Sequence, residues 1–161
     1  LGKPTTVTMS SLELKVPPPL VALCGALLMW LASFVVASIE VPFLLRVSGA
    51  TALAFTGLGF IVAGLVSFMR AKTTVNSTKP TSTTSLVSTG VYRFTRNPMY
   101  LGLLLVLLGW ATFLANAVPF LIAPLFVLYI NRFQITPEER TLASMFGAEF
   151  SAYRESVRRW L

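Results

Sequence analysis

Residues 90–102, GVYRFTRNPMYLG, gather arginine and tyrosine side chains directly before a long apolar run. Arginine presents a planar set of donors that suits a carboxylate or a phosphate. Asn97 followed by Pro98 is typical of a helix start, where free N–H groups favour an anion. The candidates for this anion site are Tyr92, Arg93, Arg96, Asn97, Pro98 and Tyr100. The alternative is a capped helix with basic and aromatic anchors at a membrane surface.

Two adjacent carboxylates, Glu138 and Glu139, form a second candidate. Thr136, Pro137 and Glu139 fit a capping box, so we expect a helix to begin there and the acidic residues to complement its dipole. Glu138 is not needed for the box. If both segments face the same side of a membrane, the two glutamates could instead hold a cationic group of a ligand.

Two glycines, Gly57 and Gly59, lie inside another apolar segment. Ala50, Gly57 and Gly64 recur every seven residues, which predicts close packing against a neighbouring helix. The alternative is a glycine-lined groove that admits a ligand.

The composition indicates the class of protein that must position these residues. Of 161 residues, 55% are hydrophobic and 12% are charged, whereas in soluble domains about a quarter of all residues are charged. We therefore expect an all-α integral membrane protein. A formal charge of +7 raises nucleic-acid binding, but the basic residues fall between apolar spans, so no nucleic-acid partner is expected. With no histidine and one cysteine, no metal site is expected either.

About four transmembrane helices are expected. The first two cover about residues 20–38 and 49–69, each near the ~20 residues that cross a bilayer. The apolar stretch 99–133 would be ~52 Å long as one helix, too long for a single span. Asn116 and Pro119 within it therefore predict a turn between two shorter helices.

These two helices form a tight hairpin at about 98–114 and 118–132. Apolar residues then recur at helical spacing to the C-terminus, which predicts an amphipathic cytoplasmic helix that Gly147 breaks or bends. The chain is expected to be a single domain, with an N-terminal tail at 1–19, two spans at 20–69, a loop at 70–97, the hairpin at 98–133 and the last helix at 136–161.

The placement of lysine and arginine predicts the orientation. Basic residues concentrate in the 70–97 loop and the C-terminal tail, so the positive-inside rule places both termini and the candidate site on the cytoplasmic side of the membrane. No Asp, Glu, Lys or Arg lies deep in a predicted span. Because proton- or ion-coupled transport usually needs such a residue, this argues against a small exporter.

Several motifs in order resemble one family. LVSTGVYRFTRNPMYLG at 86–102, the apolar hairpin, PEER at 137–140 and FGAEFSAYRESVRRWL at 146–161 are similar to the isoprenylcysteine carboxyl methyltransferase and phospholipid methyltransferase superfamily. The resemblance runs from about residue 73 to the C-terminus. The first two spans match only in hydropathy and in the Gly57/Gly59 pair.

The resemblance implies S-adenosyl-L-methionine as methyl donor, S-adenosyl-L-homocysteine as product, and a cofactor pocket closed by the C-terminal segment. By position, Arg96, Asn97, Pro98 and Tyr100 take the place of the family's Arg-His-Pro-x-Tyr signature. Glu138 and Glu139 take the place of its paired glutamates, and Gly57 and Gly59 that of a glycine pair. Most members have histidine where this chain has Asn97, which can orient a ligand but cannot shuttle a proton.

Charge complementarity agrees with this cofactor. Arginine donors and a helix start suit its carboxylate, the glutamates suit its ammonium, and the tyrosine faces, Tyr92 included, suit its sulfonium. We expect Arg96, Tyr100 and Glu138 to serve the reaction, with membrane lipids around the protein and a lipophilic acceptor entering from the bilayer. A carboxylate or thiolate acceptor needs no base, whereas an amine would need one of the glutamates. Phospholipid-amine or small-thiol transfer, a non-catalytic membrane protein and a small transporter remain the alternatives.

Overall fold

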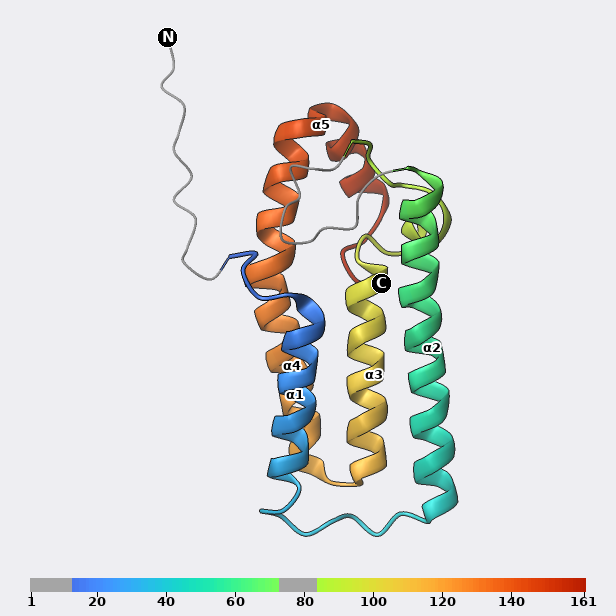
Figure 1. Ribbon diagram of the computed structural model, residues 1–161, viewed down its shortest axis with the longest axis vertical. Coiled ribbons are helices and arrows are strands. Elements are labelled where there is room, and N and C mark those ends of the chain that lie inside the picture. The colour runs from blue at the N-terminus through green and yellow to red at the C-terminus, as the bar shows by residue number, and fades with distance from the viewer. Residues whose placement is uncertain (1–12, 73–83) are drawn as a thin grey trace.

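The computed structural model describes residues 13–72 and 84–161, and every regular element in this part of the chain is helical. Figure 1 shows an elongated bundle in which α3 lies between α1 and α2. The elements are α1 (Pro18–Ala32), α2 (Phe43–Arg70), the 3-10 turn η2 (Gly90–Arg93), α3 (Pro98–Leu114), α4 (Ala117–Ile130), the π-helical turn η3 (Asn131–Ile135) and α5 (Thr136–Ser156).

Within residues 13–72 and 84–161, two helices are long and apolar enough to cross a membrane: α2, and the helix that runs from Ala117 to Ser156. This helix has 40 residues with a bend at Gly147, and its part before the bend, from Ala117 to Phe146, is about 45 Å long, more than the ~30 Å of a hydrocarbon core. The whole helix does not fit within a hydrocarbon core, so its polar α5 part extends out of the membrane region. The two remaining apolar helices, α1 and α3, have 15 and 17 residues.

Small residues bring α2 and α3 into close contact. A Cβ on Gly57 would lie 2.5 Å from the Gly102 carbonyl oxygen, and one on Gly109 would lie 2.9 Å from that of Ala50. A Cβ on Gly64 would lie 2.7 Å from the Met99 side chain. The packing predicted from the seven-residue spacing is confirmed, and any larger residue at these positions would push α2 away from α3.

The turn between α3 and α4 was predicted correctly. Ala115 adopts the left-handed conformation (φ 48°) that ends α3, and the buried Asn116 side chain accepts a hydrogen bond from the Val118 N–H at 3.0 Å. The Asn116 amide also donates to the Val36 carbonyl at 2.6 Å, which ties the turn to the segment after α1. One asparagine thus caps α4 and closes this end of the bundle.

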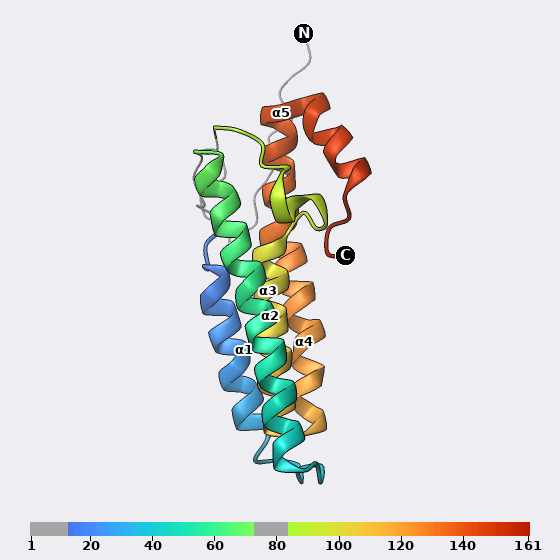
Figure 2. The same cartoon turned by 90° about the vertical axis from the view of Figure 1, so that its right-hand side faces the viewer.

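The capping box predicted at Thr136 is wrong. Thr136 has helical backbone angles, and its hydroxyl donates to the Asn131 carbonyl at 2.7 Å, so the chain passes from α4 through η3 into α5 without a break. The predicted C-terminal helix is therefore the continuation of the hairpin's second helix. It does bend at Gly147 (φ 48°, ψ −116°). Figure 2 shows the last part of α5, in red, turning back along the bundle towards the C-terminus.

Candidate functional site

Arg96 lies where η2, the start of α3, the start of α5 and the C-terminal tail meet. Its guanidinium donates to Glu139 Oε1 at 3.0 Å and to the carbonyls of Arg154 and Val157 at 2.7 and 3.0 Å. Its backbone N–H donates to the Arg158 carbonyl. The side chain is 11% exposed, and its buried Nε has no acceptor among the described residues. Arg96 therefore holds the tail and keeps one donor free.

Glu139 lies between two guanidinium groups. It accepts from Arg96 and also from Arg159, whose Nε lies 3.2 Å from Oε1 and whose Nη2 pairs with Oε2. The Glu139 side chain is 14% exposed. Its charge is thus balanced by the protein's own cations, and it does not take the capping role predicted for it.

Glu138 has a different environment. It is partly buried and accepts a hydrogen bond from the Tyr100 hydroxyl. Within residues 13–72 and 84–161, no basic side chain forms an ion pair with it. Burial raises the pKa of Glu138 to about 8, against a lowering by the Tyr100 hydrogen bond, and the neighbouring Glu139 charge raises it further. Of the two glutamates, Glu138 is the one that lacks a cation.

Tyr92 is a buried residue of the η2 turn. Its ring packs edge-on against Phe68 at 5.5 Å, and its carbonyl accepts from the Tyr153 hydroxyl at 2.8 Å. Burial raises the Tyr92 pKa, and the charges of Tyr153 and Glu138 add to the shift. The Tyr92 phenol therefore stays neutral, and its ring packs between η2 and α2.

Asn97 stands at the position before α3, and Pro98 is the first helical residue, as predicted. The Asn97 side chain, however, does not cap the helix: its amide donates to the Arg159 carbonyl at 2.9 Å. The buried Thr95 hydroxyl donates to the same carbonyl at 3.3 Å and accepts from the Asn97 N–H. These polar groups therefore hold the C-terminal tail.

The structure brings together most of the predicted site residues. Arg96, Asn97, Tyr100, Glu138 and Glu139 are linked directly or through the C-terminal tail, and Tyr92 joins them through Tyr153 and the charge of Glu138.

The predicted glycine pair lies elsewhere. Gly57 packs against Gly102, and no atom lies within 4 Å of a Cβ placed on Gly59. It is Gly64, about 10 Å further along α2, that contacts Pro98 and Met99 at the site. Arg93 is exposed on η2.

The site also contains residues that the sequence reasoning missed. Arg159, Thr95 and Tyr153 contact it directly, and the indole N–H of Trp160 donates to Asn131 Oδ1 at 3.1 Å. The basic C-terminal tail could have indicated Arg159, because its arginines are candidates to pair with the glutamates of the 137–140 motif.

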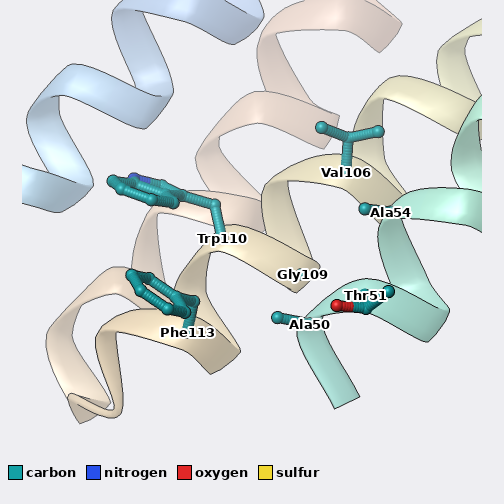
Figure 3. Close-up of a pocket in the computed structure, with 7 residues that line it drawn as sticks. All are labelled: Ala50, Thr51, Ala54, Val106, Gly109, Trp110 and Phe113. Atoms are coloured by element: carbon teal, nitrogen blue, oxygen red, sulfur yellow. The ribbon is translucent and has the colours of Figure 1, made fainter. Parts of the chain in front are cut away.

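A groove lies on the other half of the bundle, between α2 and α3 (Figure 3). It has a volume of about 330 Å³ and a mainly apolar lining: Ala50, Thr51, Ala54, Val106, Gly109, Trp110 and Phe113. Figure 3 shows the rings of Trp110 and Phe113 on the same side of α3. Val106 also lies next to Gly57, and it is six residues, or about 9 Å, along α3 from Tyr100. The groove contains none of the charged site residues.

A family model described as phospholipid methyltransferase matches residues 45–149. The chain belongs to this family. The match covers α2 to α5, including Arg96, Tyr100 and both glutamates, so the resemblance seen in the motifs is confirmed.

Two proteins are similar in sequence to this member of the phospholipid methyltransferase family. A Schizosaccharomyces pombe protein named protein-S-isoprenylcysteine O-methyltransferase is 30% identical over 122 residues, 74% of this chain and 52% of the yeast protein. The chain thus spans about half the length of that relative. An uncharacterized Haemophilus influenzae protein is 51% identical over 63 residues, 39% of this chain and the whole of that protein. No solved structure matches the chain. The family supports an enzyme that transfers methyl groups to membrane substrates.

Proposed function

We propose that this chain transfers a methyl group from S-adenosyl-L-methionine to a lipophilic acceptor at the cytoplasmic face of a membrane. The observation that carries the proposal is Glu138, a partly buried carboxyl group that is hydrogen-bonded to Tyr100 and has no cationic partner among the described residues. The cofactor's ammonium would supply that cation, and a buried unpaired carboxyl is otherwise costly. Four spans, α1 to α4, with both termini in the cytoplasm, complete the proposed arrangement.

A second observation concerns the carboxylate of the cofactor. The buried Nε of Arg96 has no acceptor in the part of the chain that the structure describes, and the first turn of α3 lies beside it. An N–H donor and a helix start both favour an anion. The cofactor would supply an activated methyl group, while Tyr92, Asn97, Pro98 and Tyr100 would shape and dry the site. Orientation of two substrates in this way can lower the activation barrier by about 7–11 kcal/mol.

The acceptor would approach from the lipid. The groove on α2 and α3 gives its hydrocarbon part an apolar surface that begins about 9 Å from Tyr100, next to Gly57. A carboxylate acceptor needs no base, and the name of the yeast relative is that of an O-methyltransferase for isoprenylcysteine. An amine acceptor, suggested by the family's phospholipid description, would have to give its proton to a group such as Glu138.

The test is incubation of the purified protein in native-lipid nanodiscs with methyl-labelled cofactor and total membrane lipid. We expect labelled lipid that disappears when S-adenosyl-L-homocysteine is added. Base treatment separates the two acceptors, because a methyl ester releases labelled methanol and an N-methyl group does not. Absence of both labelled lipid and cofactor binding would contradict the proposal.

Cofactor binding is also expected to depend on pH. With a Glu138 pKa of about 8, roughly nine-tenths of the protein carries a protonated Glu138 at pH 7. Pairing with an ammonium requires the anion, so binding should release a proton, and the affinity should rise about tenfold per pH unit below pH 8 and level off above it. Titration calorimetry of S-adenosyl-L-homocysteine in buffers of different ionisation enthalpy measures the released proton. A pH-independent affinity between pH 6 and 8 would contradict this assignment.

A further inference from the structure

The segment that precedes α1 binds the junction between α4 and α5. Glu13 is the first described residue, and its side chain is only 1% exposed. Oε1 lies 2.8 Å from Arg132 Nη1 and Oε2 lies 3.5 Å from Arg140 Nη1. Figure 1 shows this blue segment beside the orange helix where α4 passes into α5. One buried carboxylate thus joins two arginines that are eight residues apart.

Backbone contacts strengthen the same junction. The Leu14 N–H donates to the Phe133 carbonyl at 3.0 Å, and the Gln134 side-chain amide donates to the Val16 carbonyl at 2.7 Å. Gln134 is fully buried. Two successive residues of the π-helical turn η3 are therefore held by residues 13–17, which we call the N-terminal strap.

The position of this turn bears on Glu138. A π-helical turn contains one residue more than an α-helical turn, so it rotates the helix that follows by about 100°. Glu138 lies three residues after the end of η3, between the two arginines that Glu13 holds. If η3 relaxed to regular helix, Glu138 would turn away from Tyr100. The π-helical turn thus sets the direction in which this carboxyl points.

We propose that Glu13 is a positioning residue for the site: it joins Arg132 to Arg140, keeps η3 π-helical and so holds the Glu138 carboxyl against Tyr100. The proposal rests on the proposed function, because it assigns Glu13 a role in cofactor binding through Glu138. From the sequence alone, residues 1–19 are predicted only to form an N-terminal tail.

Charge and burial indicate that loss of Glu13 acts on geometry more than on folding. Arg132 and Arg140 are 53% and 42% exposed, so water can solvate both once the carboxylate is gone. Glutamine at position 13 leaves no buried charge and nearly the same volume. The expected consequence is therefore a loosened η3 in a folded protein, rather than a general loss of stability.

The test compares Glu13→Gln with Glu149→Gln, the same chemical change at an exposed position of α5. For Glu13→Gln we expect faster hydrogen–deuterium exchange in peptides covering 131–140, with unchanged exchange in α3. We also expect S-adenosyl-L-homocysteine to bind about tenfold more weakly, the lower end of the loss seen when a residue that orients a ligand-holding side chain is removed. The pH midpoint of binding should shift, whereas Glu149→Gln should match the wild type in all three measurements.

Wild-type exchange at 131–140, or wild-type affinity and pH midpoint, in Glu13→Gln would overturn the proposal. If that variant does not fold, Arg140→Gln removes the exposed partner of one of the two Glu13 ion pairs. We expect this variant to raise hydrogen–deuterium exchange in the same peptides and to weaken S-adenosyl-L-homocysteine binding about threefold. Wild-type exchange and affinity in Arg140→Gln would overturn the proposal as well. A wild-type protein that binds no S-adenosyl-L-homocysteine would instead refute the proposed function, so the two failures are told apart by the wild-type measurement.

Discussion

Replacement of Glu138 with glutamine is expected to weaken S-adenosyl-L-homocysteine binding about a hundredfold while the protein stays folded. The variant keeps an oxygen for the Tyr100 hydroxyl but removes the anion proposed to pair with the ligand's ammonium. Loss of one partner of a buried charge pair costs about 2–5 kcal/mol, and a hundredfold lies within that range. Titration calorimetry in detergent or nanodiscs measures the affinity.

Folding should survive because glutamine resembles the protonated carboxyl group. The pKa of Glu138 is raised in the folded state, so the folded protein keeps a proton that the unfolded chain releases above about pH 4.5. Glu138 therefore contributes stability at low pH, and this contribution is lost as the pH rises towards 8. In the glutamine variant, position 138 should no longer contribute a decrease in stability as the pH rises. Thermal unfolding of both proteins at pH 6 and pH 9 measures this difference.

The matched comparison is Glu139→Gln, whose main effect should be on stability, with a smaller effect on binding than Glu138→Gln. Glu139 neutralises Arg96 and Arg159, so its loss leaves two partly buried guanidinium groups without an anion. We expect the larger loss of stability in this variant, about 3 kcal/mol in the free energy of unfolding. We also expect trypsin to cleave its C-terminal tail more readily. Equal effects of the two substitutions on binding and on stability would refute the division of roles between the glutamates.

Local sequence signals predicted the middle of the fold well. Asn97 and Pro98 located the start of α3, and Asn116 with Pro119 located the turn to α4, because such residues act on the backbone beside them. The α4–α5 junction escaped prediction for the opposite reason. A favourable capping pattern at Thr136 was overridden by contacts with Glu13 and Leu14, which are more than a hundred residues away in the chain.

The site shows the same division between local and long-range information. Arg96, Tyr100 and the glutamates could be found because they stand in short motifs. The capping pattern separates Glu139 from Glu138, but nothing in the sequence indicates that Glu139 alone pairs with cations. The difference arises from Arg96 and Arg159, which both pair with Glu139, and Arg159 reaches it only after the helix bends at Gly147 and returns to α3.

Replacement of Arg96 with lysine is expected to release the C-terminal tail even though the charge is kept. The guanidinium reaches Glu139 and the carbonyls of Arg154 and Val157 at the same time. Lysine offers a single ammonium on a flexible stem, so it cannot satisfy three acceptors that lie in different directions. Because the unsatisfied groups are partly buried, we expect a loss of about 2–3 kcal/mol in the free energy of unfolding.

The tail itself provides the measurement. Residues 157–161 are held by Arg96, by Asn97 and through Trp160 to Asn131, so trypsin should cut after Arg158 slowly in the wild type and severalfold faster in Arg96→Lys. Arg70→Lys, an exposed substitution at the end of α2, is the control and should behave as wild type. Because the tail covers the start of α3, its release should also expose the proposed site and weaken S-adenosyl-L-homocysteine binding. Equal cleavage rates in Arg96→Lys and wild type would show that Arg96 does not hold the tail, and its free Nε would then be its main link to the site.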